Sequence, residues 1–162
     1  MKNALKASTI LSWFNLIVWG LFAGITVLGA LFINPVLLIA TLIMGVTVLH
    51  SYACLQLLKS IKDPALPLSS QTPVGIRFIG FIALFIGILY FMQGLGVIQN
   101  ARTLMPSMEA QLPPQFKDID LYHTIIKLGI FFLVTGASIA INVFLSFRLL
   151  RWYLFLREND IS

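Results

Sequence analysis

The chain has 162 residues, of which 59% are hydrophobic and only 10% are charged. Soluble domains carry about 25% charged residues, so this composition leaves too little polar surface for a fold surrounded by water. The net charge is +5. No basic face interleaved with aromatic residues lies outside the apolar segments, and we therefore expect no nucleic-acid partner.

Four long apolar runs, each free of Asp and Glu, begin at Ile10, Val36, Phe78 and Leu128. A bilayer core about 30 Å thick is crossed by roughly 20 helical residues, and each run is long enough. A single segment in lipid satisfies its own backbone hydrogen bonds only as a helix. We therefore predict an all-α polytopic membrane protein with four transmembrane helices in an antiparallel bundle, with the lipid bilayer as its surroundings.

The predicted organisation is a single membrane domain over residues 1–162. Its parts are four spans at approximately 10–33, 36–58, 75–98 and 125–148, an external amphipathic loop at 99–124, and a cytoplasmic interfacial tail at 149–162. The first apolar run has 24 residues. A cleavable signal has an apolar core of about 7–15 residues, so we expect this run to be retained as a span.

Basic residues are distributed unequally about the predicted spans. Eight lie beside the termini or between the second and third spans: Lys2, Lys6, Lys59, Lys62, Arg77, Arg148, Arg151 and Arg157. The opposite side has three, Arg102, Lys117 and Lys127. Because cytoplasmic loops carry the excess of Lys and Arg, we predict an integral protein of the cytoplasmic (plasma) membrane with both termini in the cytoplasm.

The connecting segments differ in length and character. Asn34-Pro35 leaves room only for a turn, so the first two spans must be antiparallel neighbours. In the external loop, Leu104, Met108, Leu112 and Phe116 recur every four residues, which predicts a surface helix up to Leu112. This helix is either a lid or docking element, or a connector that keeps its apolar side out of water. After the fourth span, arginines alternate with apolar residues, which predicts that the helix continues into the interface.

No pattern typical of catalysis or metal binding occurs in the spans. All six acids lie outside them, which argues against transport coupled through a membrane-embedded carboxylate: Asp63, Glu109, Asp118, Asp120, Glu158 and Asp160. The only histidines, His50 and His123, are predicted at different depths, and Cys54 is the single cysteine. Asp118, Asp120 and His123 could hold a divalent ion, but acids at this position more often cap a helix. We expect no catalytic residue, no metal site and no cofactor.

Neutral polar residues in the predicted cytoplasmic half of the spans are Ser12, Asn15, His50, Asn142 and Ser146. One interpretation is a polar cavity for a ligand, centred on Asn15, His50 and Asn142. The other is hydrogen bonding between helices, which is worth about 0.6 kcal/mol per bond on average in membranes. The sequence favours the second interpretation and leaves the first open.

Small residues recur at helical spacing in three of the spans, where they allow helix backbones to approach closely. The predicted helix-packing residues are Gly20, Gly24, Gly80, Ala83, Gly87, Gly94, Gly136 and Ala140. These exceed the needs of one compact bundle, so we expect self-association or contact with another membrane protein.

The leading hypothesis is a non-enzymatic assembly or accessory subunit that acts through helix–helix contacts. The alternative is a transporter or channel for a small molecule or lipid, built from one copy or several, that uses the polar cavity. Neither the ligand, the partner nor the number of copies follows from the sequence.

Overall fold

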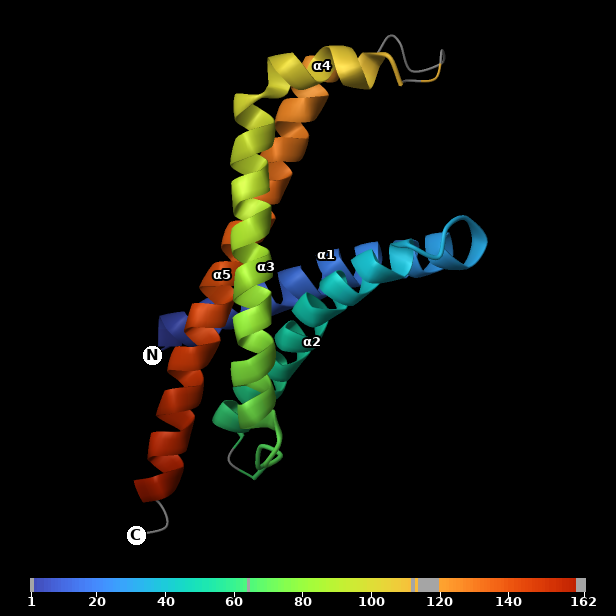
Figure 1. Cartoon of the computed structure of the whole chain (residues 1–162). Helices are drawn as coiled ribbons and strands as arrows, with labels where there is room; N and C mark the ends of the chain where they lie inside the picture. Colours follow the sequence, from blue (N-terminus) through green and yellow to red (C-terminus); the bar gives the residue numbers. More distant parts are fainter. Residues whose placement is uncertain (1, 64, 112, 114–119, 160–162) are drawn as a thin grey trace. The chain divides into compact units, whose positions relative to one another are not determined.

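The computed structural model describes residues 2–63, 65–111, 113 and 120–159. Its helices are α1 (Lys2–Phe32), α2 (Leu37–Lys62), α3 (Thr72–Gln99), α4 (Ala101–Glu109) and α5 (Leu121–Asn159), and no described residue lies in a strand (Figure 1). Four of these helices, α1, α2, α3 and α5, are long and apolar enough to cross a membrane. The all-α fold class with four potential spans is therefore confirmed.

The long helices extend beyond the predicted spans at most of their ends. Helix α1 begins at Lys2 and α5 continues to Asn159, so the basic residues Lys2 near the start of α1 and Arg157 near the end of α5 lie within helix. Hydropathy marks the part of a helix that suits lipid, whereas hydrogen bonding decides where the helix ends. The helical continuation expected after the fourth span is present, and the segment predicted as an external loop contains α4.

Local chemistry explains several helix ends. Asp63 has extended backbone angles (φ −128°, ψ 97°) at the end of α2, as expected for a residue that precedes a proline. Pro73 is the second residue of α3, where its missing N–H costs no helical hydrogen bond. Between α1 and α2, the Asn34 side chain accepts a hydrogen bond from the backbone N–H of Val36 at 2.9 Å and closes the turn.

The chain divides into two compact units. The first unit comprises residues 1–86 and 138–162, and the second comprises residues 87–137. Helices α3 and α5 each contribute one part to each unit. The two units are described separately below.

In the first unit, α1 and α2 form an antiparallel hairpin and lie side by side (Figure 1). The hydroxyls of Thr41 and Thr26 are hydrogen-bonded across this pair at 2.9 Å. The apolar core of the unit draws on all four long helices and on the loop before α3. Its buried members are Leu57, Leu58, Leu68, Ile76, Leu149 and Leu150, and Leu5 of α1 packs against them.

The loop before α3 is fixed to this core by one long-range hydrogen bond. The backbone N–H of Leu68 donates to the hydroxyl of Tyr153 on α5 at 3.2 Å. Because Leu68 is itself buried in the core, the loop is held by both apolar packing and a polar contact. The loop before α3 is therefore held against the core of the first unit, beside the last part of α5.

In the second unit, the last part of α3 packs against the first part of α5. A Cβ added to Gly136 would lie 2.5 Å from the backbone nitrogen of Phe91 and 2.6 Å from the carbonyl oxygen of Gly87. A Cβ added to Gly94 would lie 2.7 Å from the carbonyl oxygen of Gly129. These distances require glycine, because the two backbones approach too closely for a side chain. The rings of Tyr90 and Phe132 stack beside this contact with centroids 5.7 Å apart.

Candidate functional site

Small polar side chains are buried between α1, α2 and α5 in the first unit, and we call this set the polar seam. Its members are Ser8, Ser12 and Asn15 on α1, Thr47, His50, Ser51 and Cys54 on α2, and Ser138, Asn142 and Ser146 on α5. All ten are buried. Residues three or four apart share one face of a helix. The polar residues of α1, α2 and α5 have this spacing, so on each helix they face the other two helices.

Asn142 and Asn15 connect α1 to α5. The Ser12 hydroxyl donates to Oδ1 of Asn142 at 3.1 Å, and the Ser8 hydroxyl reaches the same oxygen at 3.5 Å. One turn away, the Ser138 hydroxyl donates to Oδ1 of Asn15 at 3.0 Å. Each asparagine therefore accepts from serine on the opposite helix.

His50 connects α2 to α5. Its Nε2 lies 3.4 Å from the Ser146 hydroxyl and 3.4 Å from the Cys54 sulfur. Helix α3 also approaches this imidazole, since a Cβ added to Gly80 would lie 3.1 Å from Cε1 of His50. His50 is 1% exposed, so α3 and α5, together with its own helix α2, shield it from the surroundings.

Four polar atoms of the seam have no hydrogen-bond partner among the described residues. They are Nδ2 of Asn15, Oγ1 of Thr47, Nδ1 of His50 and Nδ2 of Asn142. A buried polar group without a partner costs about 1–3 kcal/mol. Two of these atoms are obligatory donors, while the imidazole nitrogen and the hydroxyl can donate or accept. Among the described residues, the seam therefore holds two unused amide donors, one imidazole nitrogen and one hydroxyl.

The structure places the three predicted ligand-binding residues, Asn15, His50 and Asn142, in this one seam. Each is bonded to a serine of another helix. Sequence reasoning did not select Ser8, Thr47 or Ser138, which are buried with them. Ser138 could have been found, because it precedes Asn142 and Ser146 at intervals of four residues and so lies on their helix face.

The predicted helix-packing residues have different surroundings. Gly80, Gly94 and Gly136 lie where an added Cβ would approach another helix within 2.7 Å. Gly87 and Ala83 are buried, and Ala140 is half-buried. At Gly20 and Gly24, by contrast, no other described segment lies within 4 Å of an added Cβ. Gly129 was not selected from the sequence, although it lies seven residues before Gly136 and therefore on the same helix face.

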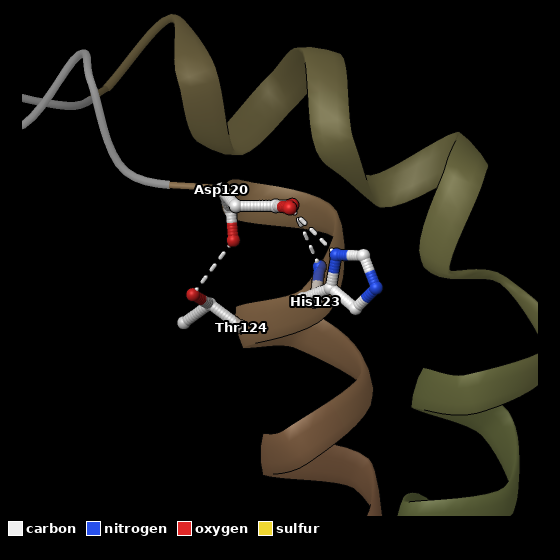
Figure 2. A network of polar contacts seen from close by, with 3 residues as sticks. All are labelled: Asp120, His123 and Thr124. Carbon is white, nitrogen blue, oxygen red and sulfur yellow. Dashed lines mark hydrogen bonds and ion pairs between the residues drawn. The ribbon is translucent and has the colours of Figure 1, made fainter.

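Asp120 caps the start of α5 (Figure 2). Its carboxylate accepts the backbone N–H of His123 at 3.1 Å and the ring Nδ1–H of His123 at 2.6 Å, and its carbonyl accepts the Thr124 hydroxyl at 2.8 Å. The hydrogen bond from the backbone N–H, followed by that from the ring, lowers the pKa of the exposed Asp120 carboxyl. The capping interpretation is therefore supported for Asp120.

A divalent-ion site at this position would also need Asp118, which lies outside the described residues. Among the described residues, no group of three His, Cys, Asp or Glu side chains is placed to hold a metal.

No protein-family model, curated protein or solved structure matches this chain.

Proposed function

We propose that this small membrane protein is a non-enzymatic assembly or accessory subunit that works through helix–helix contacts. The observation that carries the proposal is the contrast between two sets of glycines. Gly80, Gly94 and Gly136 are used within the chain, whereas Gly20 and Gly24 on α1 face no described segment.

Gly20 and Gly24 are four residues apart and lie on one face of α1. Apolar side chains flank this face, and Leu21, Ile25 and Leu28 are more than half exposed. Lipid offers little hydrophobic gain to pair helices, so association depends on close van der Waals contact, which small residues permit. A glycine pair on an uncovered helix face thus fits a second transmembrane helix, from another copy or from another membrane protein.

The test is a double variant, Gly20→Leu with Gly24→Leu, purified in mild detergent and examined by native mass spectrometry and by cross-linking in lipid. We expect the wild-type chain to appear in a dimer or larger complex, and the variant to lose roughly tenfold in association, a change of about 1.4 kcal/mol. The matched control is Gly96→Leu, because an added Cβ there also meets no described segment. A wild-type monomer in both detergent and lipid would contradict the proposal.

A second candidate function is favoured by the unpartnered atoms of the polar seam. In this view the chain is a transporter or channel for a small molecule or lipid, and Asn15, His50 and Asn142 contact the transported ligand in the cytoplasmic half of the membrane. The seam supplies two free amide donors and one free imidazole nitrogen among the described residues. The same atoms would be satisfied by bound water if the seam serves only to join helices.

Native mass spectrometry separates these two functions. A small molecule retained by the wild-type chain and lost in His50→Phe would favour transport. Retention of no molecule by the wild-type chain, with unchanged complexes in His50→Phe, would favour the assembly function. Ser70→Ala in the exposed loop is a control for the purification itself.

The proposed orientation places both termini and the loop between α2 and α3 in the cytoplasm, in the plasma membrane. The excess of basic residues at these positions supports it. The fourth long helix also supports it, since an even number of crossings returns the chain to its starting side.

A further inference from the structure

A groove lies in the first unit between the beginning of α3 and the last part of α5. Its volume is about 470 Å³, and its lining combines two arginines with apolar and aromatic side chains and one acid: Arg77 and Phe81 on α3, and Phe147, Leu150, Arg151, Leu154, Phe155 and Glu158 on α5. This groove is separate from the polar seam and from the glycine face of α1.

The helical spacing explains why these residues share one groove. Arg77 and Phe81 are four apart on α3, and Phe147, Arg151 and Phe155 are four apart on α5, so each set occupies one helix face. One end of the groove is closed where Gly80 allows the ring of Phe147 to approach α3. There the rings of Phe81 and Phe147 pack with centroids 5.3 Å apart.

The two arginines of the groove lie one helical turn from the aromatic contact, since Arg77 and Arg151 are each four residues from the rings that form it. Arg77 and Arg151 are exposed, and within the described part of the chain neither guanidinium forms an ion pair. Among the described residues of the lining, Glu158 is the one acid, so two positive charges face one negative charge there. A neighbouring hollow is lined by Arg148, Arg151, Trp152 and Phe155, which adds another cation and an aromatic ring suited to the membrane interface.

We propose that this groove binds one anionic phospholipid, with its phosphate between Arg77 and Arg151 and an acyl chain against Phe81 and Phe147. Guanidinium groups bind phosphate oxygens through paired hydrogen bonds, and the apolar floor matches a hydrocarbon tail. Basic pockets between spanning helices on the cytoplasmic side are typical lipid headgroup sites. The positive balance of the lining selects an anionic headgroup over a zwitterionic one.

The experiment uses the full chain, delipidated in mild detergent and titrated with lipids of identical acyl chains. Native mass spectrometry measures binding of phosphatidylglycerol, phosphatidylethanolamine and phosphatidylcholine, and inorganic phosphate is added as a competitor. We expect phosphatidylglycerol to bind at least tenfold more tightly than either zwitterionic lipid. Millimolar inorganic phosphate should not displace it, because the free ion makes no contact with the apolar floor.

The variants Arg77→Gln and Arg151→Gln should each weaken phosphatidylglycerol binding about fivefold, the change expected when one cation close to a phosphate is removed. Glu158→Gln should strengthen phosphatidylglycerol binding, because it neutralises an acid of the lining. The matched control is Arg157→Gln, which removes the same charge from the same end of α5 but does not line the groove. Its binding should stay within twofold of the wild type.

The four substituted residues are all exposed: Arg77, Arg151, Arg157 and Glu158. The circular dichroism and monodispersity of the variants should therefore be unchanged, and any loss of lipid binding can be assigned to the groove. Equal weakening by Arg157→Gln would show diffuse charge attraction and overturn the proposal. Equal binding of the three lipids, a preference for phosphatidylethanolamine, or full displacement by inorganic phosphate would overturn it as well. The proposal does not depend on the assembly function, which is tested at α1.

Discussion

The two units of the chain join their helices by different means. In the first unit, α5 presents Ser138, Asn142 and Ser146 to α1 and α2, and hydrogen bonds connect the helices. In the second unit, Gly94, Gly129 and Gly136 bring the backbones of α3 and α5 into direct contact. Both means suit a membrane, where apolar side chains gain little by leaving lipid.

These two kinds of helix contact should respond differently to amino-acid substitution. A backbone contact through glycine has no room for another atom, so any side chain must force the helices apart. A hydrogen-bonded contact consists of several weak and partly replaceable interactions. Substitutions at these contacts should therefore lower the free energy of unfolding more in the second unit than in the first.

The largest effect is expected for Gly136→Leu in the second unit. An added Cβ would overlap the backbone of Phe91 and of Gly87, and neither can rotate away. We expect the free energy of unfolding to fall by about 3 kcal/mol or more, measured by reversible unfolding in mixed micelles.

Gly96→Leu is the matched control, because no other described segment lies within 4 Å of an added Cβ there. It should change stability by less than about 0.5 kcal/mol. Similar effects of Gly136→Leu and Gly96→Leu would refute the close backbone contact.

A smaller effect is expected for Asn142→Ala in the first unit. The variant removes the oxygen that accepts from Ser12 and Ser8, and at about 0.6 kcal/mol per bond we expect a loss of about 1 kcal/mol. A double-mutant cycle with Ser12→Ala should give a coupling energy of about 0.6 kcal/mol.

The control cycle pairs Asn142→Ala with Ser138→Ala, whose hydroxyl is bonded to Asn15 instead. Its coupling energy should be close to zero. If Asn142→Ala destabilises the chain as much as Gly136→Leu does, the contrast between the two units does not hold.

The smallest effect is expected at the start of α5. Asp120→Ala removes the acceptor for the backbone N–H of His123, so hydrogen exchange at that amide should become faster. Asp120→Asn, which keeps a capping oxygen, should preserve most of the protection. Global unfolding should change little in either variant, because the cap lies at a helix end.

This cap should also depend on pH. The hydrogen bonds to His123 lower the pKa of Asp120 in the folded chain below that of the unfolded chain, about 3.9. The stabilisation is therefore fully present above about pH 5 and is lost as pH falls through the lowered folded value. Protection of the His123 amide that is independent of pH between 6 and 2 would contradict this assignment.

Composition was sufficient to predict the four long helices, because runs of apolar residues without acids have no other stable form in lipid. The positions of Asn15, His50 and Asn142 along their spans placed them at similar depth, and the structure buries all three in the polar seam of the first unit. The partners of these residues were not predictable. Depth along a helix follows from residue number, but the rotation of each helix about its axis decides whether Asn142 meets Ser12 or His50.

The glycines illustrate the same limit. Spacing alone placed Gly20 and Gly80 in one class, yet only Gly80 lies against another helix of the described chain. Gly129 was not predicted, because no small residue stands three or four positions after it, where the chain has Phe132 and Leu133. Small residues indicate where helices can approach, and the tertiary arrangement decides where they do.

The account depends most directly on the four helices crossing a bilayer with both termini in the cytoplasm. A membrane-impermeant maleimide added to intact cells can test this with single cysteines in a Cys54→Ser background. The cysteines are introduced one at a time by Lys2→Cys, Asn34→Cys, Ser70→Cys, Ser107→Cys and Glu158→Cys. We predict labelling from outside only for Asn34→Cys and Ser107→Cys, and labelling of the other three only after the membrane is opened. Labelling of Lys2→Cys and Glu158→Cys from opposite sides, or of all five from outside, would contradict the account.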